Sequence, residues 1–292
     1  MKQTSAQFLE TASGNMANPR LRENMDRLGR SLPLDRSAAI DALGNFEELR
    51  SHFSRVKDHT LNHLEYYLRR YQEKVLQRGG KVHWAATPSG LNRIVLDICR
   101  EADAETVGKA KSMVTEETGL TEYLQEHGLE VTETDLGEYI IQLADEPPSH
   151  IVAPAFHKSR QDIEQLFLEH HELGERTLAA PGDMVGEARA VLRQKFFDAE
   201  VGIIGANALV AEDGRSMLVT NEGNGDLLST LPRVLIVCAT IEKVLPRPED
   251  AGALLRLLTR SAVALPATAY TSFYVGARGS QDLDGPDQFH VV

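Results

Sequence analysis

The sequence contains very little cysteine, the residue that forms disulfides and binds iron–sulfur clusters and structural zinc. The 292 residues include two cysteines, Cys99 and Cys238, which lie far apart in apolar stretches. Two cysteines exclude a disulfide framework and fit a reducing compartment. They also exclude a cysteine-ligated iron–sulfur cluster or a structural zinc site within this chain, because such sites need several thiolates.

Long apolar runs and familiar phosphate-binding loops are missing as well. No stretch approaches the roughly 20 apolar residues that a membrane helix needs. No apolar run follows a basic start, so we expect no secretory signal. The sequence has no P-loop, no G-x-G-x-x-G fingerprint and no G-x-S-x-G elbow, and Gly202-x-x-Gly205 is only superficially similar. We therefore expect a cytoplasmic protein that does not enter the membrane.

Basic residues are fewer than acidic residues, and they are unevenly distributed along the chain. The formal net charge is −12. Residues 1–80 carry 13 basic and 10 acidic residues, whereas the remaining residues carry 18 and 33. An acidic main body argues against general nucleic-acid binding, which depends on neutralising phosphates. The shift of charge near residue 80 predicts that the first part of the chain forms a separate unit.

The most informative stretch that is present runs from Val201 to Gly225. Two apolar runs flank the turn signal Asp213-Gly214, which predicts a hairpin. The second run leads into Asn221-Glu222-Gly223-Asn224-Gly225, a sequence rich in positions that tolerate positive φ or form hydrogen bonds. Polar, glycine-rich loops at the ends of buried strands are the usual ligand sites of α/β proteins. A plain tight turn that caps the next helix is the alternative.

From residue 81 onward, strand-like runs alternate with helical patterns. This order predicts an α/β fold with a mainly parallel sheet flanked by helices, and the 201–220 hairpin would make that sheet mixed. The expected strands are 81–86, 107–111, 129–131, 150–153, 234–238, 270–275 and 289–292. The sequence stops at Val292 within the last of them, so we expect either that the native polypeptide continues or that it has been trimmed.

Residues 46–78 carry apolar residues every three or four positions, and Gly79-Gly80 follows them. This pattern predicts one long amphipathic helix. We divide the chain into an N-terminal helical arm at 1–45, the long helix at 46–80 and an α/β domain at 81–292. His59 and His63 share the metal-binding spacing i, i+4, but packing or surface roles are favoured over a metal site.

Several polar groups follow other predicted strands. Lys109, Lys111 and Ser112 precede a helix and could attract an anion, although a solvated charged loop explains them equally well. Asp135 and Glu138 could hold a polar ligand, but helix capping explains Asp135 equally well.

Two histidines, His150 and His157, flank the Ala153-Pro154 turn. Each could serve acid–base chemistry, because the pKa of histidine lies near neutrality. Neither has a visible partner in the sequence, so hydrogen-bonding roles are favoured.

Five stretches together resemble the LUD domain family, in its LutB-type, lactate-utilisation form, over about residues 46–292. They are Gly79 to Ala85, Lys111 to Glu117, Glu133 to Leu143, Pro147 to Lys158, and Val219 to Gly225. The resemblance implies a fold similar to the NagB/RpiA/CoA-transferase-like group. It also implies a cytoplasmic multi-subunit system that oxidises L-lactate to pyruvate.

Members of this type continue into a C-terminal ferredoxin-like region that carries [4Fe–4S] clusters. That region is absent from this sequence, and its two cysteines could not hold such clusters. The resemblance therefore implies that this chain holds no cofactor and that the electron-transfer clusters lie elsewhere in the full-length protein. It also implies companion lactate-utilisation subunits as partners, with a homo-oligomer as one option.

We place the site on the polar positions that match the family stretches. Glu222 and His150 are the candidates for proton transfer. The expected ligand, a small carboxylate or other anion, is assigned to a larger set: Lys111, Ser112, Glu138, Asn207, Asn221, Gly223 and Asn224. The first alternative is a stand-alone enzyme of the same fold group that acts on a phosphorylated or CoA-linked substrate. The second is an assembly module without a ligand.

Overall fold

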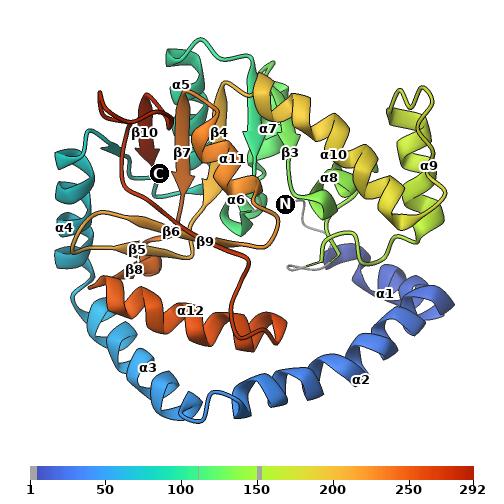
Figure 1. Cartoon of the computed structure of the whole chain (residues 1–292), viewed down its shortest axis with the longest axis horizontal. Helices are drawn as coiled ribbons and strands as arrows, with labels where there is room; N and C mark the ends of the chain where they lie inside the picture. Colours follow the sequence, from blue (N-terminus) through green and yellow to red (C-terminus); the bar gives the residue numbers. More distant parts are fainter. Residues whose placement is uncertain (1–4, 111, 150–152) are drawn as a thin grey trace.

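A parallel six-stranded sheet forms the centre of the protein in the computed structural model, which describes residues 5–110, 112–149 and 153–292 (Figure 1). Every neighbouring pair of strands in this sheet is parallel. The strands, in sheet order, are β1 (Lys81–Val82), β10 (Gln288–Val291), β7 (Val234–Cys238), β4 (Val201–Gly205), β2 (Thr106–Lys109) and β3 (Glu130–Glu133). The predicted α/β class with a mainly parallel sheet is confirmed.

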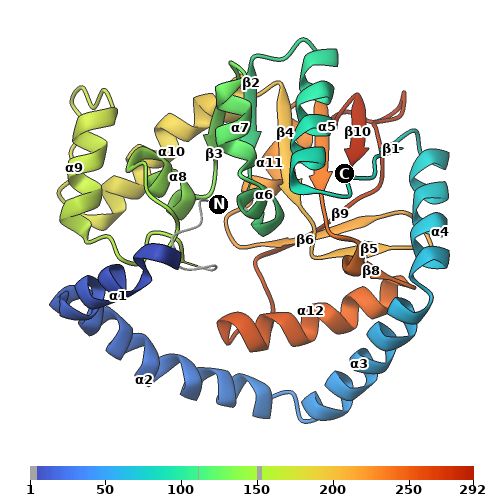
Figure 2. The same cartoon turned by 180° about the vertical axis from the view of Figure 1, so that it is seen from behind.

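Helices cover both faces of this sheet, which is why its central strands are apolar on both sides. One face packs against α5 (Pro88–Glu101), α6 (Met113–Thr118) and α7 (Leu120–Glu126), with Ile203 and Ile236 in the contact. The other face, which points away from the viewer in Figure 2, packs against a second set of helices. That set is α4 (Leu64–Gln77), α8 (Leu136–Leu143), α9 (Arg160–His170), α10 (Pro181–Asp198) and α11 (Asn224–Thr230).

Helix α11 lies unusually close to strand β4. A Cβ atom added to Gly202 would stand 2.1 Å from the carbonyl oxygen of Leu228, so only glycine fits at this position. A Cβ atom added to Gly108 on β2 would stand 2.4 Å from the side chain of the same leucine. These glycines allow the helix that follows the Asn221–Asn224 loop to rest directly on the sheet, and their role is packing.

A second, four-stranded sheet stands beside the first. It comprises β8 (Val244–Leu245), β5 (Ala208–Val210), β6 (Ser216–Thr220) and β9 (Tyr270–Tyr274), in that order. Strands β5 and β6 form the predicted hairpin around Asp213-Gly214. The expectation that this hairpin lies in the main sheet is wrong, because the run Val201–Val210 breaks at Ala206-Asn207 and its two halves enter different sheets.

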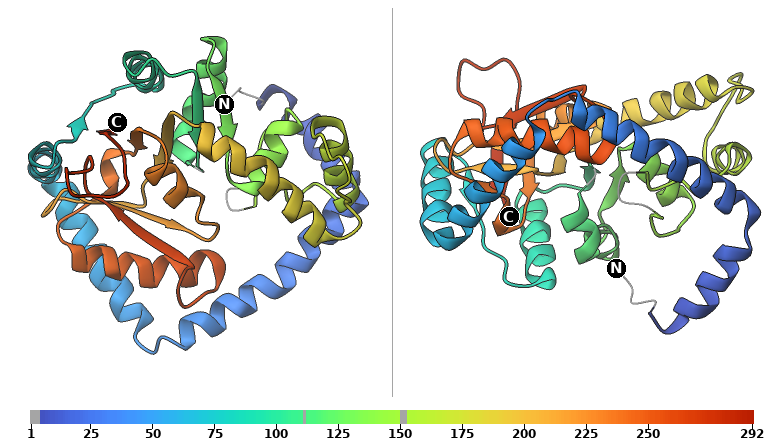
Figure 3. Two further views of the ribbon diagram at one scale, coloured as in Figure 1. Left: turned by 45° about the horizontal axis from the view of Figure 1, so that its top comes forward. Right: turned by 90° about the horizontal axis from the view of Figure 1, so that it is seen from below.

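The N-terminal part of the chain is helical and curves around one side of the molecule (Figures 1 and 3). It comprises η1 (Ser5–Gln7), α1 (Phe8–Ala17), α2 (Pro19–Asp41) and α3 (Phe46–Asn62), followed by α4. Helices α2 and α3 both pack against α12 (Pro248–Val263), and the guanidinium of Arg36 donates to the carbonyl oxygen of Ser261 at 3.2 Å. The short helix η2 (Ile241–Lys243) precedes β8.

The single long helix expected over residues 46–78 is in fact two helices. His63 separates α3 from α4, with φ −125° and ψ 32°, and its Nδ1 lies 2.8 Å from the carbonyl oxygen of His59. The break lets α3 follow α12 while α4 follows the edges of both sheets, so packing on two different surfaces overrides the continuous helical pattern. His59 contacts the hydroxyl of Tyr67 at 3.0 Å, which agrees with local roles for both histidines.

The strand expected at 150–153 falls mainly on residues outside those that the structure describes. Within the described residues, no helix is both long enough and apolar enough to cross a bilayer.

Two histidines pair across the edge of the main sheet. The Nε2 atom of His83 lies 3.0 Å from Nδ1 of His290, and the rings are stacked. Burial, together with the nearby His83 and Lys81, lowers the pKa of His290 to about 4. The pair is therefore neutral at pH 7, with one ring donating a hydrogen bond to the other.

We expect acid to weaken the fold through this pair. Because the folded pKa of His290 is depressed from its unfolded value of about 6.5, its contribution is complete above pH 6.5 and lost as the pH falls toward 4. The loss amounts to at most about 3 kcal/mol. Urea unfolding at pH 7, 6 and 5 measures it. In His290→Asn this part of the pH slope should disappear, whereas substitution of the exposed His127 by Asn should preserve it; equal slopes in both variants would contradict the assignment.

Candidate functional site

A cavity of about 450 Å³ lies at the carboxyl ends of β2, β4 and β7. Ala110, Ala206 and Thr240, which follow these three strands, line it from the sheet side. After β2 the chain continues to β3, on one side of β2 in the sheet. After β4 it passes through the second sheet and returns to β7, on the opposite side of β4. Such a divergence opens a crevice between neighbouring strands, and ligands of open α/β sheets bind there. The volume falls within the range typical of small-molecule sites.

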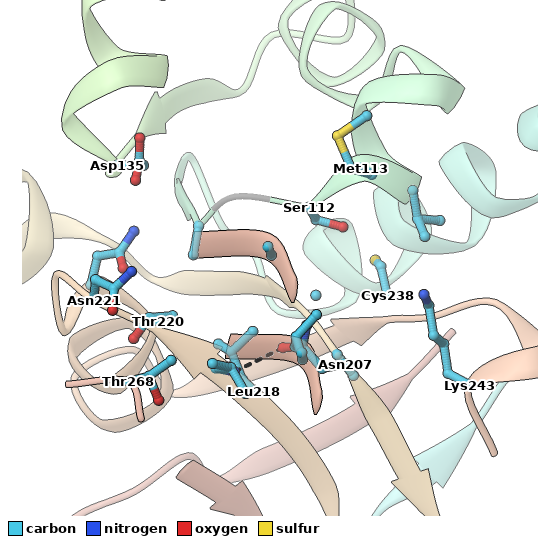
Figure 4. A pocket seen from close by; sticks show the side chains of 18 of the residues that line it. Ser112, Met113, Asp135, Asn207, Leu218, Thr220, Asn221, Cys238, Lys243 and Thr268 are labelled. Atoms are coloured by element: carbon cyan, nitrogen blue, oxygen red, sulfur yellow. Dashed lines mark hydrogen bonds between the residues drawn. The ribbon is translucent and has the colours of Figure 1, made fainter. Parts of the chain in front are cut away.

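The loop that follows β6 forms part of the cavity wall. Asn221, Glu222 and Asn224 line the cavity, and Asn221 lies beside Thr220 in Figure 4. Gly223 adopts φ 75° and caps helix α11, as the sequence predicts for a glycine in this loop. The Glu222 carboxylate accepts a hydrogen bond from the backbone nitrogen of Asn221 at 3.2 Å, so it shapes the loop while remaining exposed. Asn224 is buried.

Three further polar side chains of the wall also have structural tasks. The Oδ1 atom of Asn207 accepts a hydrogen bond from the backbone nitrogen of Val219 at 2.8 Å, and this bond holds β6 beside the break between the two sheets (Figure 4). Asp135 caps α8 by accepting bonds from two backbone nitrogens. Ser112 caps α6 through a long bond of 3.5 Å. Their rigid attachment fixes the shape of the cavity.

Helix α12 and its neighbours close the opposite side. Leu258, Ala262 and Val263 give this wall an apolar character, and Leu218 adds to it from β6. Thr259, Thr268 and Lys243 add polar groups to the lining. None of the α12 residues was expected from the sequence. Only the position of Thr240, just after the buried strand Val234–Cys238, carried a signal that could have been used.

The charges on the described lining are mainly negative. The described lining carries one ammonium group, that of Lys243, and four carboxylates, those of Glu117, Asp135, Glu222 and Glu242. In Figure 4, Asp135 lies toward one end of the cavity and Lys243 toward the other. This arrangement can orient a polar ligand by hydrogen bonds, but it attracts an anion only near Lys243.

Of the predicted site residues, five line the cavity: Ser112, Asn207, Asn221, Glu222 and Asn224. Gly223 lies between two of them. Glu138 is absent from the lining and is buried in α8. Lys111 and His150 lie outside the residues that the structure describes. His157 contacts the carboxylate of Glu146 at 2.8 Å, which agrees with a hydrogen-bonding role.

A buried charge cluster lies at the end of β2, next to the cavity residue Ala110. The Nζ atom of Lys109 lies 2.6 Å from a carboxylate oxygen of Glu116 and 2.7 Å from one of Glu133. Thr121 donates a further hydrogen bond to Glu133 at 2.9 Å. The Lys109 side chain has no exposed surface. The cluster therefore links β2 to β3, α6 and α7 through side-chain contacts beside the cavity.

The pKa values in this cluster follow from burial and pairing. Burial works to lower the pKa of Lys109, but the carboxylates of Glu133, Glu116 and Glu138 outweigh it, so this pKa is raised and the ammonium form persists. Burial raises the pKa of Glu133 against the opposing effect of Lys109. The pKa of Glu133 therefore lies above that of an exposed glutamate.

The thiols do not fit an iron–sulfur cluster. Cys99 and Cys238 are both buried and free, and burial raises the pKa of each to about 12. Cluster ligands are thiolates and are usually four in number. Among the described residues, no group of three or more His, Cys, Asp or Glu side chains is placed to hold a metal ion. The part of the chain that the structure describes therefore does not supply the ligands of such a cluster.

Similar proteins exist in several bacteria. "Lactate utilization protein B" of Bacillus velezensis is 42% identical over 293 residues, and the protein of the same name from Bacillus subtilis is 40% identical over 293 residues. The "Uncharacterized electron transport protein YkgF" of Escherichia coli is 38% identical over 292 residues. Each alignment covers 100% of this chain and 61% of the relative, so the chain spans less than two thirds of their length.

A solved structure and a family profile complete the comparisons. The crystal structure of a DUF162 family protein from Deinococcus radiodurans aligns with a TM-score of 0.43 and 11% sequence identity, over 78% of this chain and 96% of that one. The LUD domain profile matches residues 68–292. This match begins within α4 and takes in both sheets and the whole lining of the cavity, and on this ground the chain belongs to the LUD domain family.

Proposed function

We propose that the chain is the LUD portion of a LutB-type protein and serves the oxidation of L-lactate to pyruvate in the cytoplasm. The observation that carries this proposal is the identity of 40% and 42%, over the whole chain, to two proteins named lactate utilization protein B. Conversion of lactate to pyruvate releases two electrons and two protons. We assign the electrons to iron–sulfur clusters outside this chain, in a further region of the protein or in companion subunits.

Within this chain, the cavity is the proposed ligand site. Among the described lining residues, Lys243 supplies the positive charge for a carboxylate, although its ammonium also lies 3.9 Å from Glu242. Glu222, on the loop after β6, is the proposed proton acceptor because its side chain is exposed at the cavity. With four carboxylates in the described lining, affinity for the lactate anion should be weak, on the order of a millimolar Kd. The same excess of carboxylates disfavours the alternative of a stand-alone enzyme for phosphorylated or CoA-linked substrates.

Filling the cavity provides the test. Ala262 is an exposed residue of α12 on the cavity wall, so a larger side chain there enters the cavity without disturbing the core. We expect Ala262→Phe, in the full-length protein with its companion subunits, to lower L-lactate-dependent dye reduction at least about tenfold while the melting temperature stays unchanged. The matched control is Ala190→Phe on the exposed surface of α10, which should retain full activity.

Two results would overturn different parts of the proposal. If the intact complex with the native sequence reduces no dye with L-lactate, the assignment to lactate oxidation fails. If Ala262→Phe behaves like Ala190→Phe, lactate oxidation stands but the cavity is not the site that it depends on.

A further inference from the structure

A second hollow, which shares no lining residue with the cavity, lies at the elbow between α3 and α4. It measures about 480 Å³ and is bounded by α3, α4, the β5–β6 turn and the start of α12. We call it the elbow groove. On α3 it is lined by His52, Arg55, Val56 and His59, which recur at helical spacing and so share one face of the helix. Nothing in the LUD resemblance or in the proposed lactate chemistry uses this surface.

Positive charge converges on the elbow groove from three separate elements. Arg55 comes from α3, Arg70 from α4, and Arg247 from the loop that precedes α12. Two carboxylates, those of Glu212 and Asp250, line it as well. In a chain with a net charge of −12, three guanidinium groups in one hollow stand out, and they repel one another unless negative charge lies between them.

The two carboxylates neutralise only part of this charge. Asp250 is buried, accepts a hydrogen bond from the backbone nitrogen of Arg247, and lies 3.7 Å from the guanidinium of the same arginine. Glu212 acts electrostatically on Arg70 and contributes to its raised pKa, behind the larger effect of a hydrogen bond to Tyr66. The guanidinium of Arg55 makes no hydrogen bond or ion pair with any residue in the described part of the chain. One guanidinium charge thus remains without a carboxylate.

Neutral hydroxyl groups hold two other members of the groove in place. The hydroxyl of Tyr66 accepts a hydrogen bond from Arg70 at 3.3 Å, and that of Tyr67 lies 3.0 Å from Nε2 of His59. A hydroxyl partner orients a donor without cancelling its charge, in contrast to a carboxylate partner. The groove therefore combines positioned donors with unneutralised charge, which is the chemistry of a site for a multiply charged oxyanion.

We propose that the elbow groove binds a ligand bearing a diphosphate group. Arginine suits this group because its planar guanidinium donates two parallel hydrogen bonds to phosphate oxygens. Arg55 and Arg70 approach the ligand from the two helices, and Arg247 approaches it from the N-terminal end of α12. Because α3 and α4 meet at His63, a bound diphosphate links the two helices and fixes the angle between them.

Inorganic pyrophosphate is the probe for this site, and its binding to the protein is measured by calorimetry at low ionic strength. We expect saturable binding that weakens with added salt, and a loss of affinity of at least about tenfold in Arg55→Ala. Arg50 and Arg69 supply matched controls on the same two helices, because each is exposed and already paired with a glutamate, Glu47 or Glu65. Arg50→Ala and Arg69→Ala should each change the affinity less than about twofold.

Two outcomes would overturn the proposal: absence of saturable pyrophosphate binding, or an equal loss of affinity in Arg55→Ala and Arg50→Ala, which would indicate general surface charge. Arg55→Lys keeps the positive charge but removes the paired hydrogen bonds of the guanidinium. If this variant binds pyrophosphate more weakly than the native protein but more tightly than Arg55→Ala, the paired hydrogen bonds contribute to binding. All of these positions are exposed or on the surface of a helix, and unchanged melting temperatures confirm that the variants fold.

Discussion

Replacing Lys109 with methionine is expected to destabilise the protein by about 3–5 kcal/mol at pH 7, because it leaves buried carboxylates without their cation. Methionine has a similar length and fills the same space, so the loss reports on charge and not on a cavity. Chemical denaturation with urea measures the loss. The pKa of Glu133 is already raised by burial, and without Lys109 it should rise further.

The effect of this substitution should therefore depend on pH in a defined direction. A carboxyl group whose folded pKa lies above its unfolded value binds more protons in the folded state, so the Lys109→Met protein regains stability relative to the native protein as the pH falls from 7 to 5. The control is Lys195→Met, which removes the exposed pair with Glu130 and should cost less than about 1 kcal/mol. A pH-independent loss would show that packing, and not charge, dominates at Lys109.

Substitution of Gly202 by alanine is expected to destabilise the protein by about 3 kcal/mol, a large effect for one added methyl group. The new Cβ would stand 2.1 Å from the carbonyl oxygen of Leu228, and a backbone atom cannot move aside as the end of a side chain can. Helix α11 must then shift away from β4 and displace the Asn221–Asn224 loop. Ligand binding in the cavity should weaken together with stability.

Gly186 on α10 is the matched control for this change. A Cβ there meets no atom within 4 Å, and the residue is helical and exposed. Gly186→Ala should therefore raise stability by up to about 1 kcal/mol, because alanine favours the helix. Thermal unfolding compares the two variants. Similar small shifts for both would mean that α11 does not rest on β4 as tightly as described.

Local patterns in the sequence predicted most of the strands and part of the site. The run Val234–Cys238 has no polar residue, and it is the buried strand β7. Both glycines of the loop after β6 were expected to tolerate positive φ; Gly223 adopts it, whereas Gly225 lies inside helix α11. Residues of this loop line the cavity. These features depend on the residues that carry them and on their immediate neighbours, so one sequence is enough to find them.

Features that depend on distant parts of the chain were not predicted. The α12 wall of the cavity arises because the second sheet brings Leu258 and Val263 over the strand ends, and their own sequence pattern only indicates a helix. The helix breaks at His63 because the residues before and after it pack against different surfaces, although their apolar residues continue one helical pattern. The burial of Lys109 did have a signal: it follows Val107 by two residues on β2, so both side chains face the same covered side of the sheet.

The order of strands in the main sheet has a kinetic consequence. Strand β1 lies at the edge of this sheet and pairs there with β10, and the register joins Lys81 to His290 across most of the chain. Contacts between residues so distant in sequence form slowly, because a long loop must close before any of them is gained. On the ribosome, β1 and the outer side of β7 must wait unpaired until β10 has been synthesised. During this interval the nascent chain presents open strand edges, and chaperones that bind extended segments would have their best access to it.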